Sequence, residues 1–317
     1  MRPTLVMALS FLASPTAALD CPEGQRPFVH AAGEDCIPTD PQRIVTLQDQ
    51  NALMPLLELG VTPVASAGHL VDGRQVYRRM EDGMDTSDIA FVGSYREPDR
   101  EAVAGQQPDL IVASPWPADL HELYLPIAPT VVIDMFNQPL EDALMQFAAL
   151  VGRTDRAQDL RGALEAQAAE VRDLLGDRLE TTTVSMIIYN PAEGNFYAIS
   201  PVQSFGVIFR TLSMTRTAAE HVGVEREYRA METLGNHAAD VMLLVTFDAN
   251  ESVFSASFED FMADPLVQAL PVAPAGQVFA VDGGAMVGSA WSKPVHGLRH
   301  ITDILLRDDL DRDLVME

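Results

Sequence analysis

Aromatic residues recur just after the short apolar runs of this sequence, where α/β proteins commonly build a ligand-binding surface. In open α/β folds ligands bind outside the carboxyl ends of parallel strands, so the residues after each strand are the first candidates for contact. Rings there suit a large, partly apolar ligand, although each ring is about equally suited to packing inside a lobe. Ligand contacts are predicted for Tyr95, Trp116, Phe136, Tyr189, Phe247 and Trp291.

A cationic side chain lies beside the first of these rings. Arg96 follows Tyr95 directly, and a guanidinium presents a planar fork that pairs two oxygen atoms at once. We therefore expect Arg96 to donate hydrogen bonds to an anionic or oxygen-rich ligand. The alternative is a surface ion pair with Glu97 or Glu101, and the sequence leaves both open.

Two histidines near predicted strand ends, His69 and His121, would suit a divalent metal bound directly by the protein. Two ligands are too few for a complete site, and His221 and His237 in the second half have no strand-end placement. We therefore predict no protein ligand to a metal, and a bare divalent-metal-binding protein remains a minor alternative.

The sequence lacks the common motifs of catalytic and nucleotide-binding sites. It has no G-x-S-x-G elbow, no phosphate loop ending in Gly-Lys-Ser/Thr, and no G-x-G-x-x-G at a strand-to-helix turn. Carboxylates are so abundant that no single pair of them is informative. We predict that the protein is not an enzyme, that it has no catalytic residues and that it needs no cofactor.

The charge balance argues against nucleic acid as a partner. The 317 residues include 46 acidic side chains but only 21 Lys and Arg, for a formal net charge of −25, whereas phosphate binding needs clustered cations. With 47% hydrophobic residues, the chain is long enough for two lobes. We expect a soluble monomer.

The N-terminal residues predict export. Residues 1–18 combine an early Arg, a short apolar run and small residues near a cleavage site, as in a secretory signal peptide. Residues 19–40 form an extension holding the chain's two cysteines, Cys21 and Cys36, which we expect to pair in an oxidising compartment. Lipid anchoring at Cys21 fits badly, because Asp20 precedes it.

The remaining chain divides into two α/β lobes. Near-continuous apolar runs, typical of parallel strands buried on both faces, alternate with helical patterns over residues 41–138 and again over 178–317. First-lobe strands are expected at 43–47, 61–66, 109–114 and 130–134. Residues 139–177 are helical, and a helix over about 155–175, roughly 30 Å long, would join the lobes as a strut.

The order of several segments resembles the iron-siderophore and cobalamin class of periplasmic solute-binding proteins. The resemblance covers residues 41 to 306 and rests on RIVTL with a helix ending ELGV, on VGSYREPDREAVAGQQPDLIVAS, on PTVVID before a helix and GR, and on W-x8-H-I-x2-ILL. It implies the class III architecture, in which two Rossmann-like lobes with parallel sheets are joined by a single long α-helix.

The resemblance also implies partners. Such proteins capture a ferric siderophore or similar iron chelate in the periplasm and deliver it to an ABC importer permease. A Glu in each lobe is thought to engage permease arginines, which assigns docking to Glu101 and, through RAMETLGNHAADVMLL, to Glu232. Both are equally typical of solvated carboxylates near a helix N-terminus.

The chelate class stays open at this point. In hydroxamate-binding relatives an Arg sits at the position of Tyr95, whereas haem-binding relatives have an Arg matching Arg96 and a Tyr where this chain has Ser94. Hydroxamate, catecholate, citrate-like, haem and cobalamin ligands are therefore all compatible with the resemblance. Because the connecting helix is long and continuous, we expect only a small closure on binding.

Overall fold

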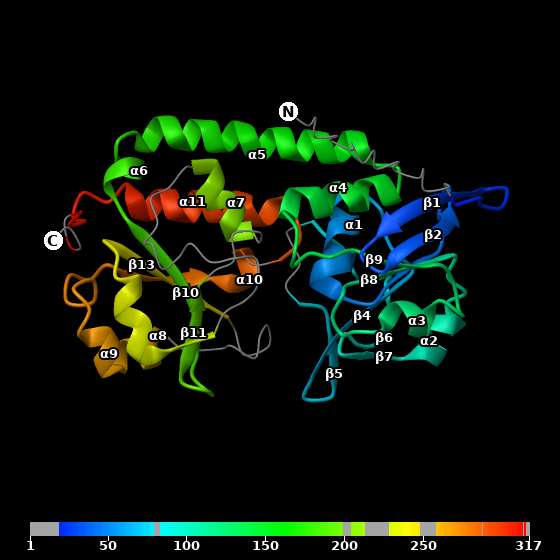
Figure 1. Ribbon diagram of the computed structural model, residues 1–317, viewed down its shortest axis with the longest axis horizontal. Helices are drawn as coiled ribbons and strands as arrows, with labels where there is room; N and C mark the ends of the chain where they lie inside the picture. The colour runs from blue at the N-terminus through cyan, green and yellow to red at the C-terminus, as the bar shows by residue number, and fades with distance from the viewer. Residues whose placement is uncertain are drawn as a thin grey trace, which may run out of the picture.

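Two α/β lobes lie side by side in the computed structural model, and one long helix, α5, runs along both (Figure 1). The structure describes residues 19–78, 83–198, 204–212, 228–247, 258–286, 288–312 and 314. Each helix within these ranges is too short or too polar to span a lipid bilayer.

The first lobe is built on a 7-stranded sheet in the order β7-β6-β4-β3-β8-β9, with β5 paired to β4. Neighbouring pairs from β6 to β9 are parallel, whereas β5 and β7 pair antiparallel. Its strands are β3 (Ile44–Thr46), β4 (Ala65–Val71), β5 (Arg74–Val76), β6 (Ala90–Ser94), β7 (Glu97–Pro98), β8 (Leu110–Ala113) and β9 (Thr130–Val132). Its helices are η1 (Asp49–Leu53), α1 (Met54–Glu58), α2 (Arg100–Gly105), α3 (Leu120–Tyr124) and α4 (Leu140–Leu150).

The second lobe has a 5-stranded sheet in the order β12-β11-β10-β13-β14, of which β10, β13 and β14 are parallel. Its strands are β10 (Val184–Asn190), β11 (Asn195–Ala198), β12 (Tyr228–Ala230), β13 (Val241–Thr246) and β14 (Val278–Asp282). Its helices are α6 (Arg178–Thr181), α7 (Ser204–Leu212), η3 (Met231–His237), α8 (Phe258–Ala263), α9 (Pro265–Gln268), α10 (Gly283–Met286) and α11 (Ser292–Leu305).

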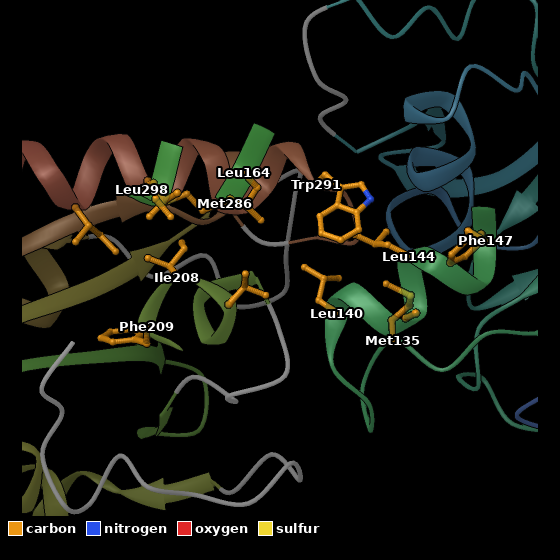
Figure 2. Packing of buried hydrophobic residues seen from close by; sticks show 14 of the residues in the cluster. Met135, Leu140, Leu144, Phe147, Leu164, Ile208, Phe209, Met286, Trp291 and Leu298 are labelled. Atoms are coloured by element: carbon orange, nitrogen blue, oxygen red, sulfur yellow. The ribbon is translucent and has the colours of Figure 1, made fainter. Parts of the chain in front are cut away.

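Helix α5 (Thr154–Leu175) has 22 residues and a length of ~33 Å, as the apolar spacing of this segment predicts. Its buried face carries Leu164, Ala168, Val171 and Leu175, and it packs against α4, α7 and α11. The helix is therefore not a free-standing strut. One hydrophobic cluster continues across both lobes beneath it, as Figure 2 shows in part.

Cys21 and Cys36 form the predicted disulfide. The segment around them is an antiparallel hairpin of β1 (Gln25–His30) and β2 (Gly33–Pro38), which the sequence analysis treated only as an extension. Phe28 and Ile37 from this hairpin are buried in the main hydrophobic cluster. The hairpin is thus part of the first lobe's packing.

Strand β4 differs from the expected one in its position. The expected segment, 61–66, contains Pro63, which has no N–H for a ladder, and the strand instead begins at Ala65. It then turns at Asp72-Gly73, both with positive φ, and returns as β5. Asp-Gly between two extended runs is a strong hairpin signal, so the turn was readable from the sequence.

Candidate ligand-binding site

Side chains from four neighbouring strands gather at the carboxyl ends of the first lobe's parallel strands. Asp49 follows β3, His69 lies in the last part of β4, Tyr95 follows β6 and Trp116 follows β8. These strands are adjacent in the order β6-β4-β3-β8, so segments up to about 70 residues apart along the chain meet at one edge of the sheet. We call Asp49, His69, Arg78, Tyr95, Arg96 and Trp116 the strand-end cluster.

Tyr95 is at the centre of this cluster. Its ring stacks on His69, with centroids 4.5 Å apart and planes 25° from parallel, and lies 5.7 Å from the ring of Trp116. Trp116 is 49% exposed, an unusual exposure for the largest apolar side chain. Two of the predicted contact residues, Tyr95 and Trp116, therefore form a continuous aromatic surface with solvent access.

Arg96 lies against the same ring, as its neighbouring position suggested. Its Nε donates to the Tyr95 hydroxyl at 3.2 Å, and its guanidinium carbon is 5.7 Å from the ring centroid. Arg96 is exposed, and within the described ranges it forms no ion pair with Glu97 or Glu101. The guanidinium thus keeps donors available for a ligand.

Arg78 also belongs to this cluster, although its position in the sequence did not predict it. The β4–β5 hairpin brings it back to the cluster, with its guanidinium carbon 4.7 Å from the Tyr95 ring centroid. Asp49 holds it there, because the carboxylate accepts the Arg78 backbone N–H at 2.8 Å and Nε at 2.9 Å, and also pairs with Nη2. The Asp72-Gly73 turn was the signal that could have located Arg78.

Two polar atoms of this region lack hydrogen-bond partners among the described residues, namely Nε2 of His69 and Oε1 of Gln48. Burial, together with the nearby positive charge of Arg78, lowers the pKa of His69 to about 4. His69 is therefore neutral at neutral pH. A buried polar atom without a partner is costly. Oε1 of Gln48 can accept a hydrogen bond, and Nε2 of His69 can accept or donate one, depending on the tautomer of the ring.

Three of the four rings predicted outside this cluster are half-buried. Phe136 lies two residues after Asp134, which accepts its backbone N–H at 2.8 Å. Tyr189 contacts Phe261 at 5.5 Å between centroids, and Phe247 packs across Gly283. Within the described residues, none of these three rings contacts Tyr95 or Trp116.

Trp291 differs from the expectation of an exposed ring. It is 2% exposed and belongs to the hydrophobic cluster between the lobes, near Leu140 and Leu144 of α4 (Figure 2). The physical reason is its place at the start of α11, where Glu58 of the first lobe accepts its backbone N–H at 2.7 Å and holds the ring against that lobe. Trp291 therefore packs the lobe junction and presents no open face to a ligand.

The two predicted docking residues occupy comparable positions in the two lobes. Glu101 is exposed in the first turn of α2, which Asp99 caps by accepting backbone N–H groups at 2.9 and 3.0 Å. Glu232 is exposed in the first turn of η3. Both carboxylates are therefore accessible to a partner at a helix N-terminus.

A cluster of metal-ligand types also exists away from this site, at His30, Asp35 and His121. Nδ1 of His30, however, accepts backbone N–H groups from Ala32 at 3.2 Å and Val132 at 3.3 Å. These bonds keep the ring proton on Nε2, which donates to Asp35 at 3.0 Å. Nε2 of His30 thus has no lone pair for a metal, and the group fastens the disulfide hairpin to α3.

Comparison with known proteins adds a family and a fold. A family model described as "Periplasmic binding protein" matches residues 44–284. The chain is 27% identical, over 72% of its length and 70% of the relative's, to the probable siderophore-binding lipoprotein YfiY of Bacillus subtilis. It is 24% identical to the ferric-anguibactin-binding protein FatB of Vibrio anguillarum, covering 81% of this chain and 79% of that one.

Solved structures share the architecture. Staphylococcus aureus SirA, determined in complex with staphyloferrin B, superposes with a TM-score of 0.72 at 18% identity, covering 90% of this chain and 99% of that chain. Holo-ViuP superposes with a TM-score of 0.69 at 20% identity, covering 91% and 96%. These likenesses establish the two-lobed fold predicted from the sequence.

Proposed function

The chain belongs to the periplasmic binding protein family, and on that premise we propose that it captures a ferric siderophore and delivers it to an ABC importer. The observation that carries the proposal is the strand-end cluster, in which Tyr95, Trp116 and Arg96 combine an exposed aromatic surface with cationic donors. FatB is named as a ferric-anguibactin-binding protein and YfiY as a probable siderophore-binding lipoprotein, which supports the same ligand class.

The proposed binding chemistry leaves the iron with its chelator. The rings of Tyr95 and Trp116 stack on apolar or aromatic parts of the chelate, which removes apolar surface from water. Arg96 donates charge-assisted hydrogen bonds to the oxygen atoms around the iron. We further propose that Phe136, Tyr189 and Phe247 border the ligand from the rest of the cleft. Iron is cargo here, and the protein supplies no ligand atom to it.

The proposal includes delivery in the periplasm. The loaded protein, an exported monomer, would dock its two lobes on the permease through Glu101 and Glu232. Closure around the ligand would be small, because α5 packs against helices of both lobes and the hydrophobic cluster continues between them. No chemical step is involved, so the protein would act as a reversible carrier and not as an enzyme.

The proposal is tested with purified mature protein and a panel of ferric hydroxamates, catecholates and citrate, with haem, cobalamin and free Zn²⁺ included. Equilibrium dialysis measures binding, and tryptophan fluorescence reports its position. We expect at least one ferric siderophore to bind, with quenching that Trp116→Phe largely removes. Trp116 is exposed and Trp291 is buried, so the two fluorophores are distinguishable.

Equal concentrations of every panel member on the two sides of the dialysis membrane would mean that none binds, and this result would overturn the proposal. Binding of Zn²⁺ without any chelate would point instead to a bare-metal carrier. If haem or cobalamin is the only panel member that binds, the proposed transport role stands, but its ligand is that compound and not a ferric siderophore. As a control, Tyr228→Phe alters an exposed second-lobe ring away from the strand-end cluster and should leave binding unchanged.

A further inference from the structure

The charge of the strand-end cluster is set by a buried carboxylate. The side chain of Asp49 is 0% exposed, and that of Arg78 is 11% exposed. Two oxygen atoms of Asp49 hold the backbone N–H, Nε and Nη2 of Arg78. Ion pairs so far removed from water are little screened by salt, so Asp49 cancels most of the charge that Arg78 would otherwise offer to a ligand.

The other members of the cluster add one positive charge. Arg96 is exposed and its guanidinium binds only the Tyr95 hydroxyl within the described part of the chain. His69 is neutral at neutral pH, since burial lowers its pKa to about 4. Two arginines against one carboxylate leave a net charge of about one positive unit in the cluster.

The field around the cluster opposes highly charged anions. The whole sequence carries a formal net charge of −25, and such a charge repels an approaching anion more strongly as the charge of the anion increases. Aromatic surface, in contrast, does not depend on ligand charge. A chelate with one negative charge or none gains the stacking on Tyr95 and Trp116 and meets little of this repulsion.

We propose that Asp49 is a specificity-determining residue, and that it restricts the cargo to ferric chelates that are neutral or mono-anionic. This inference rests on the proposed function and narrows it. Ferric chelates whose iron is held by three catecholates carry three negative charges and are disfavoured. Chelates built from hydroxamates, or from two hydroxamates and one catecholate, fall within the preferred range.

Three hexadentate ferric chelates of similar size test the proposal with the intact mature protein. They are a neutral tris-hydroxamate, a mono-anionic chelate with two hydroxamates and one catecholate, and a tri-anionic tris-catecholate. All three saturate the iron, so charge is the main variable. The affinities are measured by equilibrium dialysis at low and at physiological salt.

We expect the neutral or the mono-anionic chelate to bind at least ~10-fold more tightly than the tri-anionic chelate. Asp49→Asn exposes the charge of Arg78 and should shift this ratio by ~10-fold or more toward the tri-anionic chelate. Arg96→Gln, an exposed change that does not depend on the buried pair, should weaken binding of both the neutral and the mono-anionic chelate and should weaken that of the mono-anionic chelate more.

Two results would overturn the inference. One is wild-type protein that prefers the tri-anionic chelate, and this result would leave the proposed function standing. The other is an unchanged ratio in folded Asp49→Asn protein, with folding checked by circular dichroism. If that variant does not fold, the ratio of chelate affinities in the wild-type protein and in Arg96→Gln still tests the inference. Absence of binding for all three chelates and for the wider panel would remove the proposed function itself.

Discussion

The carboxylate of Glu58, the last residue of α1 in the first lobe, caps the start of α11 in the second lobe. Its oxygen atoms accept the backbone N–H groups of Trp291 at 2.7 Å and Ser292 at 2.8 Å. A helix N-terminus leaves N–H groups without intrahelical partners and favours negative charge. Here the cap comes from the first lobe, so the two hydrogen bonds that satisfy the N-terminus of α11 also connect the two lobes.

Replacing Glu58 by Ala should therefore destabilise the protein by about 1 to 2 kcal/mol, because two N–H groups lose a charged acceptor near a buried ring. Urea unfolding measures this loss, and the fluorescence of Trp291 should shift to longer wavelength as water enters the junction. Glu170→Ala, on the exposed face of α5, is the matched control. Equal stability of E58A and wild type would contradict the prediction.

A second stability prediction concerns the close approach of α7 and α11. A Cβ built on Gly297 lies 2.1 Å from Cδ1 of Ile208, whereas a Cβ on Gly162 of α5 has nothing within 4 Å. Gly297→Ala should cost about 1 to 3 kcal/mol through overpacking. Gly162→Ala should stabilise by about 0.5 to 1 kcal/mol through helix propensity. Thermal unfolding of both variants checks the opposite signs, and equal shifts would refute the packing argument.

The neutral His69 should make stability depend on pH. Its pKa is about 4 in the folded protein, against an ordinary value of 6.5, so between these values the unfolded chain binds more protons. The free energy of unfolding therefore rises with pH across this window and falls on acidification.

His69→Gln should reduce the stability difference between pH 5 and pH 7 by about 1 kcal/mol, a figure that allows for partial exposure of the ring. Urea unfolding at the two pH values measures the difference, with His300→Gln on α11 as the control variant. An identical pH dependence in H69Q and wild type would rule out this role for His69.

The proposed docking residues predict a separation of uptake from binding. Glu101→Arg or Glu232→Arg reverses an exposed charge in one lobe and should reduce chelate uptake severalfold, with little change in chelate affinity. Glu170→Arg adds the same charge on α5 and should leave uptake near normal. Normal uptake by both docking variants would refute the assignment, and a loss of affinity would indicate a ligand-binding role instead.

Local patterns in the sequence were sufficient for the repeating architecture and for part of the site. Apolar runs predicted the parallel strands, and three-and-four spacing predicted α5, because these patterns reflect burial on two faces of a strand or one face of a helix. The sequence predicted that Tyr95, Arg96 and Trp116 lie near strand ends. They come together because parallel strands end at the same edge of a sheet, whichever segments lie between them.

The tertiary structure decided the roles of two other residues. Trp291 follows the same strand-end pattern as Trp116 but is buried, since burial depends on how closely the second lobe approaches α4. Arg78 joins the cluster only because the β4–β5 hairpin returns it to Asp49. Strand order and turns thus determine which residues reach the carboxyl edge of the sheet, whereas tertiary packing decides which of them remain exposed and with which charged partner.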